Sequence, residues 1–152
     1  RIVVLGGQAV GKTALVTRYV ENSFMSAYNH TLEDKLFEKR GMIDQEPCAV
    51  ELLDTCGYGH GWMKFRPTDN SVRVVLVYST CNRSSFKLIQ KAIYDMKLPS
   101  QVTLVGTMKD RSDARVVTEK EGWDLASQWG ITFFETSAKD GTGVEQAFAS
   151  LV

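Results

Sequence analysis

The chain has 152 residues, of which 43% are hydrophobic, so it is large enough to bury one sizeable core as a single domain. Its 18 lysines and arginines balance 18 aspartates and glutamates, and this zero net charge gives no bulk signal for nucleic acid or an anionic membrane. Three well-separated cysteines without a CxxC pair fit a reducing compartment better than a disulfide framework or a zinc site, and no apolar run reaches the ~20 residues of a membrane span.

Short apolar runs alternate with helical stretches from the start of the chain. Residues 1–5 read RIVVL and predict a buried strand, and residues 12–22 follow with a helical pattern. The polar, aperiodic residues 23–34 predict a loop. Two further runs, residues 34–43 and 46–54, flank a short polar turn and therefore predict a β-hairpin.

Three more apolar runs in the second half of the chain predict strands, at residues 72–79, 101–107 and 131–135. Between the first two of them, residues 85–96 carry apolar side chains at helical spacing. The side chains expected on the buried face of this helix are Phe86, Ile89, Ile93 and Met96.

Two capping-box patterns predict the starts of the last two helices, one formed by Thr118 with Glu121 and one by Thr142 with Glu145. The inner face of the final helix is expected to carry Val144, Ala147, Phe148 and Leu151. Alternating strands and helices imply an α/β fold with a six-stranded, mostly parallel sheet, one antiparallel hairpin and helices on both faces. We expect residues 1–152 to form one domain with trimmed termini, because the chain begins in an apolar strand and stops in a helical pattern.

The sequence GGQAVGKT, residues 6–13, fits the phosphate-loop pattern G-x-x-x-x-G-K-[ST]. It lies between a predicted buried strand and a helix start, which an ordinary glycine-rich turn would not require. Backbone N–H groups would hold phosphates at the positive end of the helix, Lys12 would reach the β- and γ-phosphates, and Thr13 would hold Mg²⁺. Asp54 ends another buried strand, where P-loop proteins place the carboxylate on the Mg²⁺ side. The pattern therefore predicts a P-loop NTPase.

Five ordered segments make the whole chain similar to the Ras-type small GTPase family, as an atypical Ras-like member. GGQAVGKTAL resembles the phosphate loop of the family, FMSAYNHTLED at residues 24–34 its first switch, and DTCG at residues 54–57 the opening of its second switch. TMKD at residues 107–110 lies where the family has NKxD or TKxD, and ETSAK at residues 135–139 matches its last guanine motif. The resemblance implies a switch that binds GTP or GDP with Mg²⁺.

The same resemblance implies roles for individual residues. Phe24 would pack edge-on against the base, Thr31 would close on Mg²⁺ and the γ-phosphate, and the Gly57 N–H would contact the γ-phosphate. Asp110 would accept hydrogen bonds from guanine N1–H and N2–H, and the Ala138 N–H would donate to O6, which favours guanine over adenine. The candidate nucleotide-binding residues are Gly6, Gln8, Ala9, Val10, Gly11, Lys12, Thr13, Ala14, Phe24, Tyr28, Thr107, Asp110, Ser137, Ala138 and Lys139. The candidate Mg²⁺ ligands are Thr13, Thr31 and Asp54, and the candidate catalytic positions are Lys12, Thr31, Gly57 and Tyr58.

Four residues depart from the family pattern at functional positions. Tyr58 replaces the Gln that orients the attacking water, and a phenol cannot contact water and γ-phosphate in the same geometry. Gln8 crowds the space that an arginine finger, worth ~10³–10⁵ in rate, would enter. Met108 replaces a Lys over the base, and losing a charged hydrogen bond of roughly 1.5–3 kcal/mol should weaken nucleotide binding roughly ten- to hundred-fold. His30 replaces the Pro before Thr31 and frees the backbone of the first switch.

Three functions follow from these residues as alternatives. The first is a switch that binds GTP and GDP and hydrolyses GTP slowly. The second is a pseudo-GTPase, an interaction module that binds nucleotide with little or no turnover, which the changes at Gln8 and Tyr58 favour. The third is a P-loop kinase or ATPase, against which Asp110 and the ETSAK segment argue strongly.

The resemblance also implies binding of effector and regulatory proteins through residues 28–36 and 57–66. In the second segment, Trp62, Met63 and Phe65 either pack on the sheet or form a partner surface, because aromatic and Met residues are enriched at interfaces. We expect a cytoplasmic monomer that does not bind nucleic acid. Membrane attachment through a lipidated tail beyond Val152 is left open.

Overall fold

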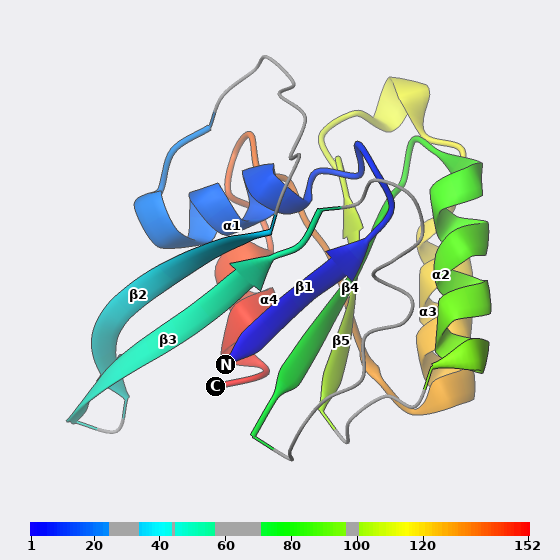
Figure 1. The fold of residues 1–152 in the computed structure, drawn as a ribbon. Coiled ribbons are helices and arrows are strands. Elements are labelled where there is room, and N and C mark those ends of the chain that lie inside the picture. Colours follow the sequence, from blue (N-terminus) through cyan, green and yellow to red (C-terminus); the bar gives the residue numbers. More distant parts are fainter. Residues whose placement is uncertain (25–33, 44, 57–70, 97–100) are drawn as a thin grey trace.

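The computed structural model describes residues 1–24, 34–43, 45–56, 71–96 and 101–152. Its six-stranded sheet has the strand order β2-β3-β1-β4-β5-β6 (Figure 1). The strands are β1 (Ile2–Gly6), β2 (Lys35–Ile43), β3 (Glu46–Asp54), β4 (Arg73–Ser79), β5 (Val102–Thr107) and β6 (Thr132–Glu135). Only the β2–β3 hairpin is antiparallel, so the predicted sheet is confirmed.

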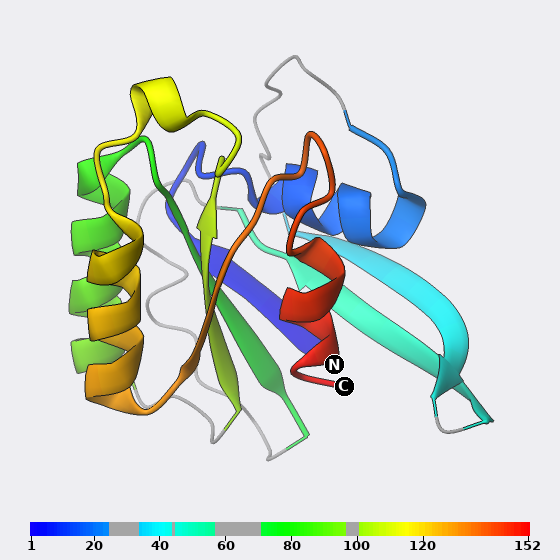
Figure 2. The same cartoon turned by 180° about the vertical axis from the view of Figure 1, so that it is seen from behind.

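Helices cover both faces of this sheet, as the sequence predicts. They are α1 (Lys12–Glu21), α2 (Arg83–Asp95), α3 (Glu119–Trp129) and α4 (Val144–Ala149). The first and last helices share one face and α2 with α3 share the other, as Figures 1 and 2 show from opposite sides. None of the helices in the described part of the chain is both long and apolar enough to cross a membrane.

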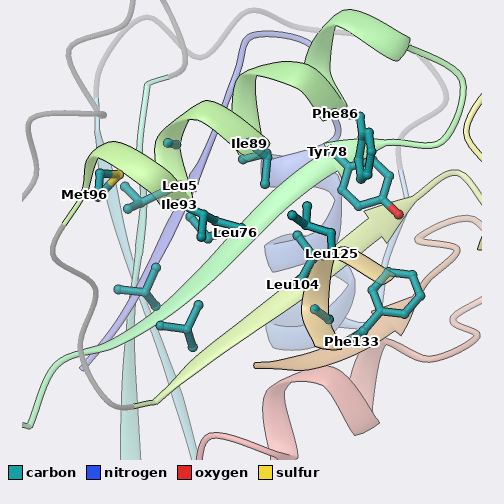
Figure 3. Close-up of a cluster of buried hydrophobic side chains, with 14 of the residues drawn as sticks. Leu5, Leu76, Tyr78, Phe86, Ile89, Ile93, Met96, Leu104, Leu125 and Phe133 are labelled. Atoms are coloured by element: carbon teal, nitrogen blue, oxygen red, sulfur yellow. The ribbon is translucent and has the colours of Figure 1, made fainter. Parts of the chain in front are cut away.

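The central strands are buried on both faces because helices lie above and below them. Side chains alternate across a strand, so Val3 and Leu5 of β1 face α2 and α3, whereas Ile2 and Val4 face α1 and α4. Figure 3 shows the cluster under α2 and α3. The predicted inner faces are confirmed, because all of Phe86, Ile89, Ile93, Met96, Val144, Ala147, Phe148 and Leu151 are buried.

One predicted capping box is confirmed and the other is wrong. The Thr118 hydroxyl accepts a hydrogen bond from the Glu121 N–H and the Glu121 carboxylate accepts from the Thr118 N–H, which opens α3. The final helix instead has Gly143 as its N-cap, with φ of 74° and no capping side chain. A Cβ at Gly143 would collide with the carbonyl oxygen of Glu135, so close backbone contact overrides the local signal of Thr142.

Candidate functional site

The candidate site lies where the loops leave the carboxyl ends of the parallel strands (Figure 1). Open α/β sheets bind ligands at this edge because the strand ends present several loops together. The loops that follow β1, β3, β5 and β6 carry the predicted motifs. The fold therefore brings together segments that are far apart in the sequence.

The predicted phosphate loop joins β1 to α1. Gly6 ends β1, and residues 12–14 form the first turn of α1 behind Gly11. Both Ala9, at φ 60°, and Gly11, at φ 93°, have left-handed backbone conformations. Such strain in an alanine persists only where the surroundings fix it, and it is concentrated at functional sites. Gln8 and Ala9 are exposed at the tip of the loop.

Lys12 is buried inside this loop and only 6% exposed. Its Nζ donates a hydrogen bond of 2.6 Å to the carbonyl oxygen of Gly7. Burial lowers the pKa of the Lys12 ammonium, while the negative charge of Asp54 opposes that shift. A buried cation with a neutral carbonyl partner is a favourable place for an anion such as phosphate.

Thr13 and Asp54 meet beside Lys12. The Thr13 hydroxyl donates to the Asp54 carboxylate, with Oγ1 2.5 Å from Oδ2. Asp54 is fully buried, and its Oδ1 accepts no hydrogen bond from any described residue. Burial raises the pKa of the Asp54 carboxyl, although the hydrogen bond from Thr13 and the charge of Lys12 oppose the shift. The strand end thus holds a carboxylate whose desolvation is incompletely compensated.

This pair fits a Mg²⁺ ion. Magnesium prefers oxygen ligands and usually takes one or two carboxylates together with substrate phosphates and water. The Oδ1 of Asp54 and the Thr13 hydroxyl could supply such oxygens, and the positive charge of Lys12 beside them would attract the phosphates. The described residues include no cluster of three or more His, Cys, Asp or Glu side chains that could hold a metal by itself. The protein ligands would therefore be completed by phosphate oxygens.

A further contact joins the chain just after β3 to the chain just before β2. The Cys56 N–H donates to Asp34 Oδ1 at 2.7 Å. The preceding Thr55 is anchored because its hydroxyl donates to the Val4 carbonyl at 2.6 Å. By its resemblance to the family, the sequence assigns Asp34 to the end of the first switch and Cys56 to the opening of the second. Nothing in the sequence predicts that these two residues are in contact.

On the other side of the site, Thr107 connects the TMKD segment with the phosphate loop. Its Oγ1 donates to the Val10 carbonyl at 2.5 Å and also lies 3.2 Å from the Tyr78 carbonyl oxygen. The side chain is 5% exposed. Thr107 therefore acts as a structural bridge between the two loops, while Asp110 lies exposed at the end of its segment.

Met108 is held by contacts that the TMKD motif does not predict. Its φ is 62°, and its carbonyl oxygen accepts hydrogen bonds from Arg111 N–H at 3.0 Å and from the Thr80 hydroxyl at 3.3 Å. The Ser79 hydroxyl donates to its sulfur, with Oγ 3.4 Å from Sδ. This contact holds the thioether against the end of β4, the strand between β1 and β5. Ser79 is a residue that the sequence did not single out.

The ETSAK segment forms a loop with its own hydrogen bonds. The carbonyl oxygen of Ser137 accepts from Gly141 N–H at 2.8 Å, its N–H donates to the Thr142 carbonyl at 2.9 Å, and its hydroxyl accepts from Asp140 N–H at 3.2 Å. The Lys109 N–H donates to the Thr136 carbonyl at 3.0 Å, which joins this loop to the TMKD segment. Ser137 is thus a buried structural centre of the loop.

Glu135, the first residue of ETSAK, serves a structural ion pair. Arg115 donates from Nη1 and Nη2 to the two carboxylate oxygens of Glu135, at 2.7 and 2.8 Å. Such bidentate pairs fix geometry as well as charge. Burial raises the pKa of the neighbouring Tyr78 hydroxyl, and the negative charge of Glu135 raises it further. The ion pair ties β6 to the segment that follows TMKD.

Several candidate residues cannot be placed in the site. Phe24 is 39% exposed at the end of the described residues 1–24. Tyr28, His30, Thr31, Gly57, Tyr58, Trp62, Met63 and Phe65 lie outside the described residues, as do residues 28–33 of the first partner segment and all of residues 57–66. The described part of the first partner segment, Asp34 to Leu36, is exposed.

Comparisons with known proteins agree over the full chain. The model of the Ras family matches residues 1–152. The chain is also 32% identical over 158 aligned residues to the Ras-like protein rasB of Dictyostelium discoideum, and the alignment covers 100% of this chain and 80% of that protein. Both matches include the phosphate loop, the TMKD segment and the ETSAK segment.

Proposed function

The chain belongs to the Ras family, and on this premise we propose that it is a guanine-nucleotide-binding switch of the small-GTPase type. In this proposal it binds GTP or GDP with Mg²⁺ and hydrolyses GTP slowly. The observation that carries the proposal is the contact between Thr13 and the buried carboxylate of Asp54, whose Oδ1 has no described partner, beside the buried Lys12. This arrangement supplies a cation for phosphate and oxygens for Mg²⁺ in one place.

At the phosphate side, each residue has a defined task. Lys12 would exchange the neutral Gly7 carbonyl for charged phosphate oxygens, which form stronger hydrogen bonds. Thr13 and Asp54 would hold Mg²⁺. When bound, this ion would neutralise the charge on the transferred phosphoryl group. The backbone of the loop would wrap the phosphates at the positive end of α1.

The TMKD and ETSAK segments form the base side of the candidate site. In this proposal they form hydrogen bonds to the guanine and orient it. Asp110 would accept from N1–H and N2–H of guanine, and the Ala138 N–H would donate to O6. Adenine has an amino donor at position 6, so it would leave these groups unsatisfied. Thr107 supports the assignment because its bridge to Val10 keeps the base side at a fixed distance from the phosphate loop.

Slow hydrolysis is proposed from two residues. Tyr58 stands at the position of the water-orienting Gln but lies outside the described residues. Gln8 is exposed at the tip of the phosphate loop, beside the place that an arginine finger would enter. The same exposed Gln8 favours the second candidate function, a pseudo-GTPase that binds nucleotide with little or no turnover.

The exposed start of β2 supports a partner surface. Leu36 is 55% exposed and follows Asp34, whose carboxylate contacts Cys56 next to the candidate Mg²⁺ ligand Asp54. A change of nucleotide at the phosphate side would reach this surface through that hydrogen bond. We therefore propose that effector and regulatory proteins bind through residues 28–36 and 57–66.

The test starts with the nucleotide that the protein carries. The purified protein is denatured, the released nucleotide is identified by chromatography, and GTP hydrolysis is then followed in a single turnover with Mg²⁺. Guanine nucleotide release is expected; release of adenine nucleotide, or binding of neither kind, would contradict the proposal. Hydrolysis too slow to measure over hours would select the pseudo-GTPase, and hydrolysis as fast as in a Gln-containing relative would contradict slow turnover.

A further inference from the structure

Arg18 on α1 uses all three guanidinium nitrogens to hold neighbouring backbone. Its Nε donates to the Ala138 carbonyl at 2.6 Å, and its Nη2 donates to the Lys139 carbonyl at 2.6 Å. Its Nη1 lies 3.2 Å from Oδ1 and 3.3 Å from the carbonyl oxygen of Asn22, the C-cap of α1. A planar guanidinium suits two adjacent acceptors, and bonds from a charged donor are the stronger class. Arg18 therefore fastens the ETSAK loop to α1.

These two carbonyls depend on Arg18. The internal hydrogen bonds of the loop engage Ser137, Asp140, Gly141 and Thr142. Among the described residues, Arg18 supplies the hydrogen bonds that the carbonyls of Ala138 and Lys139 accept. Without Arg18, the peptide groups that contain these two carbonyls would lose the hydrogen bonds that hold them against α1.

The carbonyl contacts also orient N–H groups. In a trans peptide the C=O and the following N–H point in opposite directions, and the chain has no cis peptide among its described residues. Arg18 holds the Ala138 carbonyl, so the Lys139 N–H points away from α1. Gly141 holds the Ser137 carbonyl, so the Ala138 N–H is fixed in the same way. Neither of these two N–H groups donates to another described residue.

We propose that Arg18 positions the Lys139 N–H, next to the Ala138 N–H that the Gly141 contact fixes, to bind the O6 carbonyl of guanine, which makes Arg18 a specificity-determining residue. The inference rests on the proposed guanine-nucleotide function and adds a residue that does not touch the base. Two adjacent donors suit a carbonyl oxygen and oppose the amino group of adenine. The cation on the Ala138 carbonyl also polarises the peptide that carries the Lys139 N–H, which strengthens that donor.

The test compares two ligands that carry an oxygen at position 6 of the purine with one that does not. GDP and inosine diphosphate carry O6, whereas 2-aminopurine riboside diphosphate keeps the 2-amino group and lacks O6. In Arg18→Met, GDP and inosine diphosphate should bind about two- to tenfold more weakly, the effect of one hydrogen bond. Binding of the analogue without O6 should not change. Competition against a fluorescent guanine nucleotide measures all three dissociation constants in the full chain.

Two further variants separate positioning from general effects. Asn22→Ala removes the side-chain oxygen that Arg18 Nη1 contacts, keeps the backbone carbonyl, and should leave the ratio of the GDP and analogue dissociation constants at the wild-type value. Arg18→Lys keeps the charge without the planar fork and should restore only part of the ratio. Full restoration by Lys would show a general charge effect and would overturn the inference.

Partial loss of folded protein would weaken the apparent binding of GDP and of the analogue equally, because both ligands need the same fold. The ratio of their dissociation constants therefore reports on the contact with O6 alone. If Arg18→Met does not fold, the ratio is measured in Arg18→Lys. If wild-type protein binds neither GDP nor inosine diphosphate, the proposed function itself fails. If wild-type protein prefers GDP over the analogue and Arg18→Met keeps the same preference, the inference about Arg18 fails and the proposed function stands.

Discussion

The two sides of the candidate site are stabilised by different interactions. On the phosphate side, Lys12 is a buried cation bound to a neutral carbonyl, and Asp54 has a raised pKa and an oxygen without a described partner. On the base side, side chains from other elements already hold the backbone, as Thr80 does at Met108 and Arg18 at Ala138. The phosphate side is therefore electrostatically incomplete, whereas the base side is arranged in advance.

This difference predicts how each side contributes to binding. Charged groups out of water interact strongly, so changes on the phosphate side should have large effects that depend on the ions present. Neutral hydrogen bonds contribute about 0.5–1.5 kcal/mol each, so single changes on the base side should have smaller effects. The following substitutions test this contrast, beginning with the largest expected effect.

Replacing Lys12 by Met should weaken GDP binding by about a hundredfold or more. The change removes the buried ammonium and its charged hydrogen bonds to phosphate, each worth about 1.5–3 kcal/mol, while keeping an apolar stem of similar length. Titration calorimetry with GDP and Mg²⁺ measures the effect. Lys91→Met, at an exposed position of α2, is the matched control and should bind GDP normally. A loss of less than tenfold in Lys12→Met would remove the electrostatic contrast between the two sides.

Removing Mg²⁺ with a chelator should release GDP about ten- to a hundredfold faster. Without the metal, the phosphate charges next to the buried Asp54 lose the cation that neutralises them. Asp54→Asn should release GDP as fast in Mg²⁺ as the wild type does in chelator, and adding chelator should then have little further effect. Stopped-flow fluorescence with a labelled GDP measures these rates. Additive effects of the chelator and the substitution would show that Asp54 does not act through the metal.

The bridge between the two sides can be removed by Thr107→Val, which keeps the shape and deletes the hydroxyl. The buried Val10 carbonyl would lose its donor, and an unsatisfied buried group costs about 1–3 kcal/mol. We expect about tenfold weaker GDP binding. Thr103→Val is the matched control, because that hydroxyl on the same strand pairs with Ser150 away from the loops. Equal GDP affinities in Thr107→Val and Thr103→Val would show that the two sides are independent.

The contrast between the two sides also explains how much the sequence could predict. Hydrophobic periodicity was sufficient for the strands and for the buried faces of α2 and α4, because these patterns are local. The phosphate loop is also local, since pattern, strand and helix are consecutive, and Asp54 was recognised because a buried strand ends there. The phosphate side could therefore be assembled from short segments.

The base side depends on contacts that no short segment contains. Arg18 contacts Ala138 across 120 positions of sequence, and Ser79 contacts Met108 across 29. Neither residue belongs to a motif, so only the fold shows what they hold. The failed capping box at Thr142 has the same cause, because the close approach of Gly143 to Glu135 is a tertiary contact. Sequence patterns thus name candidate ligand-binding groups, whereas the residues that hold the backbone next to them are found only in the fold.

The smallest effect is expected from Ser79→Ala on the base side. Ser79 donates a weak hydrogen bond to the Met108 sulfur, and its hydroxyl also accepts from the Cys81 N–H, so the substitution alone changes two contacts. Met108→Leu removes the sulfur and keeps the apolar volume. If Ser79 acts through Met108, Ser79→Ala should speed GDP release about twofold in the wild type and should have no effect in a protein that already carries Met108→Leu. A double-mutant cycle measures this coupling. The same acceleration in both backgrounds would assign the effect to Cys81 instead, and the base side would then be supported by Thr107 and Arg18 without the thioether.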